Sequence, residues 1–144
     1  MRRLAAILLT CAAQSAAAWT FKADPICKMI QPTGDGSITV TYDPATGEYA
    51  MMLTLVTDHW VPSDRLTMAF IGARPFQIST DRHFLSDNDT RLTVTDTGFG
   101  NVLDGLQFND VAQVRSGEQT MTIPLAGAAE AVAAFRNCPA PQLS

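Results

Sequence analysis

The sequence contains no stretch of about 20 consecutive apolar residues, the length that a helix needs to cross a bilayer. Its main apolar run, Leu4 to Ala13, is far shorter, and later stretches are interrupted by charged or turn residues. We therefore expect no membrane span.

Basic residues are also scarce, ten against fourteen acidic ones. An acidic protein repels a phosphate backbone, so we expect no nucleic-acid partner.

Motifs of the common hydrolases, ATPases and dehydrogenases are missing as well. The chain has no Gly-x-Ser-x-Gly elbow and no phosphate-binding loop, and Gly98-Phe99-Gly100 lacks the third glycine of a dinucleotide-binding turn. The two histidines, His59 and His83, have no zinc-like spacing to the cysteines. We interpret Asp87-Asn88-Asp89 as a solvated turn, because the remaining ligands of a calcium loop do not follow in register. We expect no metal and no cofactor, and an enzyme is the less favoured interpretation.

Residues 1–18 have the three parts of a secretory signal peptide. Arg2 and Arg3 form a charged start, the apolar run follows, and Ala16-Ala17-Ala18 offers a small-x-small cleavage pattern. We expect cleavage before Trp19, a periplasmic or secreted protein, and a single β-rich domain over residues 19–144. Because the leader carries two arginines and no acids, its removal leaves 126 residues and changes the formal net charge from −4 to −6. The alternative is a lipid-anchored envelope protein processed at Cys11, although Thr10 stands where such sites have Gly, Ala or Ser.

Two of the three cysteines remain after this cleavage, Cys27 and Cys138. An isolated pair near the two ends of a chain usually forms a disulfide in an oxidising compartment. We therefore predict a Cys27–Cys138 disulfide, with a free thiol or an intermolecular bond as the alternatives. The absence of a Cys-x-x-Cys pattern argues against thiol-disulfide exchange.

Apolar and polar residues alternate along most of the expected mature chain, which predicts strands with one buried face. The clearest example, Ser37 to Tyr42, is followed by a turn at Asp43–Gly47 and a returning strand from Glu48 to Thr57. Further short strands are expected at 26–31, 66–70, 76–79, 82–85, 91–95, 111–115 and 119–123. This spacing predicts a mainly β fold, an antiparallel β-sandwich or barrel. Alternation indicates faces and not strand order, so it does not separate the two.

The C-terminal segment has a different pattern. Residues 126–137 are rich in alanine, and Leu125, Ala128, Val132 and Phe135 recur at helical spacing before Pro139. We predict one C-terminal amphipathic α-helix that packs on the sheet and ends near Cys138. Residues 98–106 are expected to be irregular, with at most one helical turn at 102–105.

Asp96-Thr97-Gly98 resembles the catalytic turn of aspartic proteases, in which two aspartates share a proton. A chain of this length would have to dimerise to supply the second aspartate. The flanking Thr95 and Phe99 do not fit that pattern. The second, apolar-apolar-Gly element of such enzymes lies downstream, whereas Phe70-Ile71-Gly72 lies upstream. We interpret the segment as a strand that ends in a turn. A dimeric aspartic-protease-like hydrolase using Asp96 is kept as an alternative.

Two loops are the candidate contact sites for a ligand or a partner protein. One holds His59 and Trp60, whose indole could stack on a sugar or peptide if it is exposed, or could cover the end of the core. The other, residues 97–105, holds Phe99 and Asn101. Loops on a rigid sheet commonly carry binding residues. We therefore expect a non-enzymatic periplasmic binding or accessory module.

Three runs, Thr80–His83, Leu92–Leu106 and Ala131–Pro139, resemble small secreted proteins of alphaproteobacteria that have no established activity. Such proteins often carry an automatic name taken from the helicase-like component of excinuclease ABC. That DNA-repair protein is a large cytoplasmic ATPase, whereas this chain is short and acidic, has an export signal and lacks a phosphate loop. The resemblance implies a bacterial periplasm and supplies no site residues.

Overall fold

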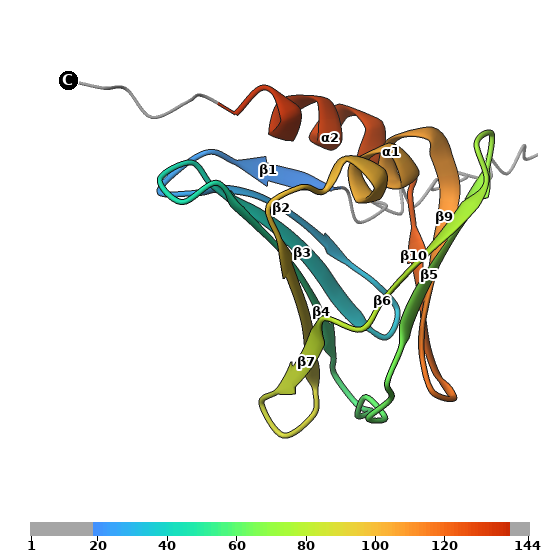
Figure 1. Ribbon diagram of the computed structural model, residues 1–144. Helices are drawn as coiled ribbons and strands as arrows, with labels where there is room; N and C mark the ends of the chain where they lie inside the picture. The colour runs from blue at the N-terminus through green and yellow to red at the C-terminus, as the bar shows by residue number, and fades with distance from the viewer. Residues whose placement is uncertain (1–18, 139–144) are drawn as a thin grey trace, which may run out of the picture.

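The alternating segments form antiparallel strands in the computed structural model, which describes residues 19–138 (Figure 1). The predicted signal peptide and Cys11 lie outside the described residues, as do residues 139–144. The elements are β1 (Thr20–Lys22), β2 (Cys27–Pro32), β3 (Gly36–Asp43), β4 (Glu48–Leu55), β5 (Leu66–Gly72), β6 (Phe76–Thr80), β7 (His83–Ser86), β8 (Arg91–Asp96), α1 (Gly100–Phe108), β9 (Asn109–Ser116), β10 (Gln119–Pro124) and α2 (Ala128–Arg136).

The strands make two antiparallel sheets, which confirms the mainly β prediction and gives a sandwich-like fold. One sheet has the order β1-β2-β3-β4-β8-β7 and the other the order β10-β9-β5-β6. The sheets converge toward one end of the molecule, and both helices lie across the wider end (Figure 1). The inward faces of both sheets supply the core, including Met29, Ile38, Val40, Leu53, Leu92, Met68, Phe70, Val114, Met121 and Ile123.

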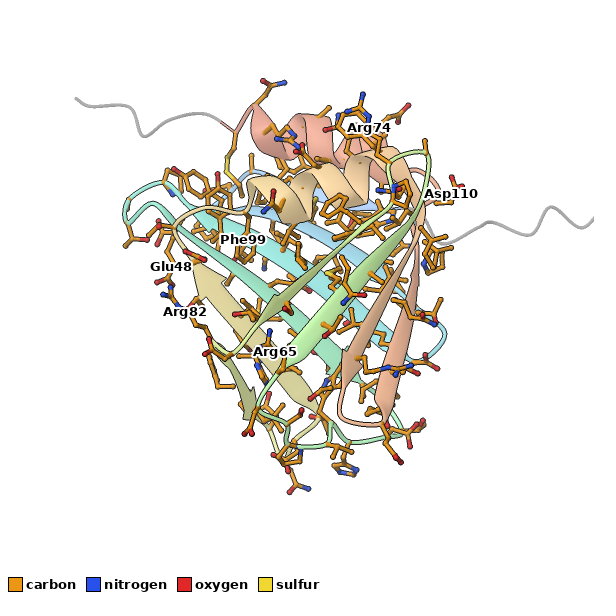
Figure 2. All side chains as sticks on the ribbon, turned by 45° about the vertical axis from the view of Figure 1, so that its right-hand side comes forward. Glu48, Arg65, Arg74, Arg82, Phe99 and Asp110 are labelled. Carbon is orange, nitrogen blue, oxygen red and sulfur yellow. A yellow bond between two sulfur atoms is a disulfide. The ribbon has the colours of Figure 1, made fainter. Side chains whose placement is uncertain are left out.

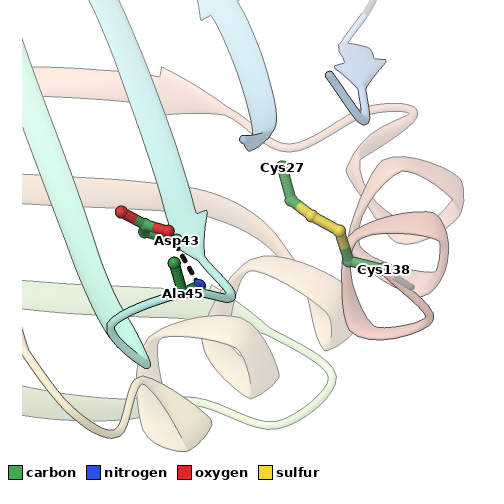
Figure 3. The surroundings of a disulfide bond; sticks show 4 residues. All are labelled: Cys27, Asp43, Ala45 and Cys138. Atoms are coloured by element: carbon green, nitrogen blue, oxygen red, sulfur yellow. Dashed lines mark hydrogen bonds between the residues drawn. A yellow bond between two sulfur atoms is a disulfide. The ribbon is translucent and has the colours of Figure 1, made fainter. Parts of the chain in front are cut away.

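The C-terminal helix prediction is confirmed. In α2 the residues Ala128, Val132 and Phe135 are buried, and Leu125 just before the helix is buried too. The helix packs on β1, β2 and α1, so its apolar face covers the wide end of the sandwich. Cys138 follows directly and bonds to Cys27 at the start of β2, with their Cα atoms 6.2 Å apart (Figure 3). The disulfide therefore joins the two ends of the described chain.

The prediction of an irregular segment with one helical turn at 102–105 is wrong, because Gly100–Phe108 form the nine-residue helix α1. Three of its side chains, Val102, Leu103 and Leu106, are buried. Gly105 lies against the ring of Phe70, which an added Cβ would overlap. The segment has no side-chain N-cap, and glycine lowers helix propensity, so its local signals are weak. Tertiary packing decides that this segment is helical.

The loop between β4 and β5 closes the narrow end of the sandwich. Trp60 lies in the core with 1% of its surface exposed, and its indole N–H donates to the Leu53 carbonyl at 2.9 Å. The Ser116 hydroxyl donates to the Val61 carbonyl at 2.8 Å. These bonds hold the loop against both sheets. Neither helix of the described chain is long and apolar enough to cross a membrane.

Candidate functional site

The two sheets leave a gap between β6 and the end of β8. β6 is the outermost strand of its sheet and pairs with β5 alone. β7 pairs with β8 only as far as Val94. Thr95 and Asp96 extend beyond this ladder and pair with β4 on one side. Two strand edges without a further strand partner in the described chain therefore border the same opening.

A pocket of about 210 Å³ lies at this gap. It is lined by β4, β5, β6, β8, the loop before α1 and the first turn of α1. Its residues are Met51, Leu66, Met68, Ile78, Ser79, Thr80, Val94, Asp96, Gly98, Phe99, Asn101 and Val102. Seven of these side chains are apolar, which is the usual composition of a small-molecule site.

Strand alternation explains which side chains point into the pocket. Ile78 and Thr80 lie opposite the buried Met68 and Leu66 on β5, so they share the inward face. Ser79 therefore faces outward, and its hydroxyl accepts a hydrogen bond from the Arg65 guanidinium at 3.0 Å. The pocket wall on β6 is thus apolar with one hydroxyl, and Arg65 is held on the outer face.

Asp96 lies on the face of β8 that points into the sandwich. Leu92 and Val94 on the same face are buried, whereas Asp96 is exposed because the sheets separate there. Its Oδ1 accepts a hydrogen bond from the Thr97 amide at 2.7 Å. In residues 19–138 no basic side chain forms an ion pair with this carboxylate. The apolar pocket thus has one negative charge at its mouth.

Phe99 forms the pocket wall nearest the helices, and only 4% of its surface is exposed (Figure 2). Its ring stacks on Tyr49 with the centroids 5.3 Å apart, and Tyr49 in turn contacts Tyr42 and Phe135. The Phe99 carbonyl also accepts the first hydrogen bond of α1, from the Leu103 amide. Phe99 is therefore a fixed wall of the pocket and not a mobile loop residue.

The structure brings together some of the residues that the sequence singled out and separates others. Phe99, Asn101 and Asp96 line one pocket. His59 is exposed in the loop at the narrow end, and Trp60 is buried beside it. An indole that is buried in this way has no exposed face on which a sugar or peptide could stack, so the structure favours the core-covering interpretation of Trp60.

Asp96-Thr97-Gly98 is the end of β8 and the start of the loop that leads to α1. The Thr97 amide donates to Oδ1 of the preceding Asp96, a local bond at this strand end. A protease dyad would need a second aspartate from another copy of the chain.

Residues 19–138 contain no group of three or more His, Cys, Asp or Glu side chains placed to hold a metal ion.

Sequence reasoning did not single out the apolar strand residues of the pocket wall, which are Met51, Leu66, Met68, Ile78 and Val94. Their alternation marks them as inward-facing, and an inward apolar residue is normally interpreted as core. The gap between β6 and β8 makes them part of a pocket wall, and that gap follows from strand order. No protein-family model, curated protein or solved structure matches this chain.

Proposed function

We propose that this protein is a non-enzymatic binding module of the periplasm that holds a small ligand in the pocket between β6 and β8. The observation that supports this is the pocket itself. Its walls are more apolar than polar, it opens at a gap between two strand edges, and strands and the start of a helix form its walls. A preformed apolar pocket with a few polar groups is the common form of a ligand site.

The composition of the pocket favours binding over catalysis. Asp96 is the only titratable side chain among the described lining residues, whereas acid-base catalysis usually needs a positioned acid and base. A dimeric hydrolase using Asp96 would require a peptide substrate to enter the same opening from a two-fold interface. The apolar walls provide contact area for a ligand and no second reacting group.

The compartment follows from two further features. A disulfide is consistent with an oxidising environment, and the leader expected at residues 1–18 would direct export. The resemblance to small secreted bacterial proteins makes the periplasm the proposed location.

The test uses 2-phenylethanol, a neutral probe that is small enough for the pocket. Titrated into ¹⁵N-labelled protein, it should shift the amide signals of Ile78, Val94 and Phe99. Ile78→Trp should fill the pocket and weaken binding at least tenfold. The matched control is Ile71→Trp on the neighbouring strand β5, where the native side chain is 53% exposed and lies outside the pocket. Shifts that spread over other surfaces, or an unchanged affinity in Ile78→Trp, would contradict the proposal.

A further inference from the structure

We infer that the pocket selects a small primary amine with an apolar, preferably aromatic, body, and that Asp96 recognises its ammonium group. This inference rests on the proposed function and names the class of ligand that the same site would take. It follows from the size of the pocket, the chemistry of its walls and the charge at its mouth.

The volume suits one ring with a short side chain. An apolar cavity of about 150 Å³ accommodates benzene. If each ligand atom takes the same share of the cavity volume as in that benzene site, the 210 Å³ of this pocket holds roughly eight non-hydrogen atoms. Lipid tails and oligosaccharides are larger than this. A molecule such as 2-phenylethylamine fits, with its ring inside and its amine at the opening.

The walls favour an aromatic body. Met51 and Met68 line the pocket from facing sheets, and Phe99 lines it from the helix side. Thioether sulfur makes favourable contacts with aromatic rings, and methionine side chains adapt to irregular shapes. Phe99 adds a further aromatic surface, since aromatic pairs are attracted beyond their buried area. An aliphatic body of equal size would lose these contacts.

The charge at the mouth favours a cation. Asp96 lies at the open end of the inward row of β8, and one of its oxygens already accepts from Thr97. Two arginines flank strands that border the pocket: Arg65 precedes β5, and Arg82 lies between β6 and β7. Arg65 donates to Ser79 on the outer face, and neither arginine lines the pocket. A ligand ammonium group would therefore meet a carboxylate, and a ligand carboxylate would meet repulsion.

Three probes of nearly equal shape separate these contributions: 2-phenylethylamine, 2-phenylethanol and phenylacetate. Each is titrated into ¹⁵N-labelled protein at neutral pH and low salt. We expect dissociation constants of roughly 0.1 to 1 mM for the amine. Because Asp96 is exposed, its preference for the amine over the alcohol should be about three- to fivefold. Phenylacetate should bind more weakly than the alcohol.

Asp96→Asn should abolish the preference for the amine over the alcohol. The matched control is Asp110→Asn, which removes the same charge from an exposed residue far from Phe99 (Figure 2) and should keep the preference. A second measurement needs no variant: in the wild type, 0.5 M salt should bring the amine and alcohol affinities together, since salt screens exposed charges.

The outcomes separate the two proposals. If the alcohol binds in the pocket but the amine shows no preference, or the preference survives in Asp96→Asn, the amine inference is wrong and the binding function stands. If phenylacetate binds best, the inference is likewise wrong. If none of the three probes binds in the pocket, the proposed function fails and the amine inference fails with it.

Discussion

Reducing the Cys27–Cys138 disulfide should remove a large part of this domain's stability. The bridge joins residues 111 positions apart. In the chain-entropy model, closing a loop of that length raises the free energy of the unfolded state by about 5 kcal/mol at 25 °C. Small domains have a total free energy of unfolding of roughly 5 to 15 kcal/mol. The reduced protein should therefore be at best marginally stable.

Urea unfolding of the oxidised and reduced protein measures this effect. With an m-value of about 1.5 kcal/mol/M, the urea midpoint should fall by about 3 M on reduction. The m-value itself should rise, because the unfolded chain without a cross-link exposes more surface. In a thermal scan, a domain of this size should lose roughly 20 °C in Tm. The double variant Cys27→Ala/Cys138→Ala is the control, since reductant should not change its midpoint.

A loss of less than about 1 kcal/mol would refute the reasoning. It would mean that the two ends stay together in the unfolded chain without the bond, so that the disulfide removes little entropy. A fall in the midpoint with an unchanged m-value would also contradict a mechanism that acts on the unfolded state.

Two further predictions concern the helix α1 and the N-terminus. Gly105→Ala should destabilise the domain by about 1 to 3 kcal/mol, because the added methyl group overpacks against Phe70. Helix propensity alone would instead stabilise the domain by about 1 kcal/mol. The urea midpoints of the variant and the wild type show which effect is larger. Gly100→Ala at the first position of the same helix meets no neighbouring atoms, so it should be neutral or stabilise the domain by up to about 1 kcal/mol. In intact-mass measurements of protein from the periplasm, we expect a mature chain that starts at Trp19; a lipid-modified Cys11 would instead show a membrane-anchored protein.

The pocket could be predicted from the sequence only in part. Asp96 is a candidate because Asp96-Thr97-Gly98 resembles the catalytic turn of aspartic proteases, and Phe99 and Asn101 are candidates because their segment is expected to be a loop. The three residues do line one pocket. The apolar walls were missed, because an inward-facing Met68 or Ile78 has the same sequence pattern whether a second sheet or a ligand covers it. Strand order decides between these outcomes.

Local pattern determined most of the fold. Period-two alternation predicts strands because successive side chains of a strand point to opposite faces, and the pattern from Ser37 to Thr57 became the hairpin of β3 and β4. The helical spacing from Ala128 to Phe135 predicted α2 for the same kind of reason. The two cysteines near the chain ends predicted the disulfide, since such a pair in an exported chain has few other partners.

Tertiary structure alone decided the remaining features. α1 buries Val102, Leu103 and Leu106 and packs Gly105 closely on Phe70, which are contacts between segments far apart in the chain. The indole of Trp60 is buried because the Leu53 carbonyl lies within reach of its N–H group. The pocket exists because β7 stops pairing with β8 at Val94. Each of these depends on which segments meet in space, and a local sequence pattern carries no information about such long-range contacts.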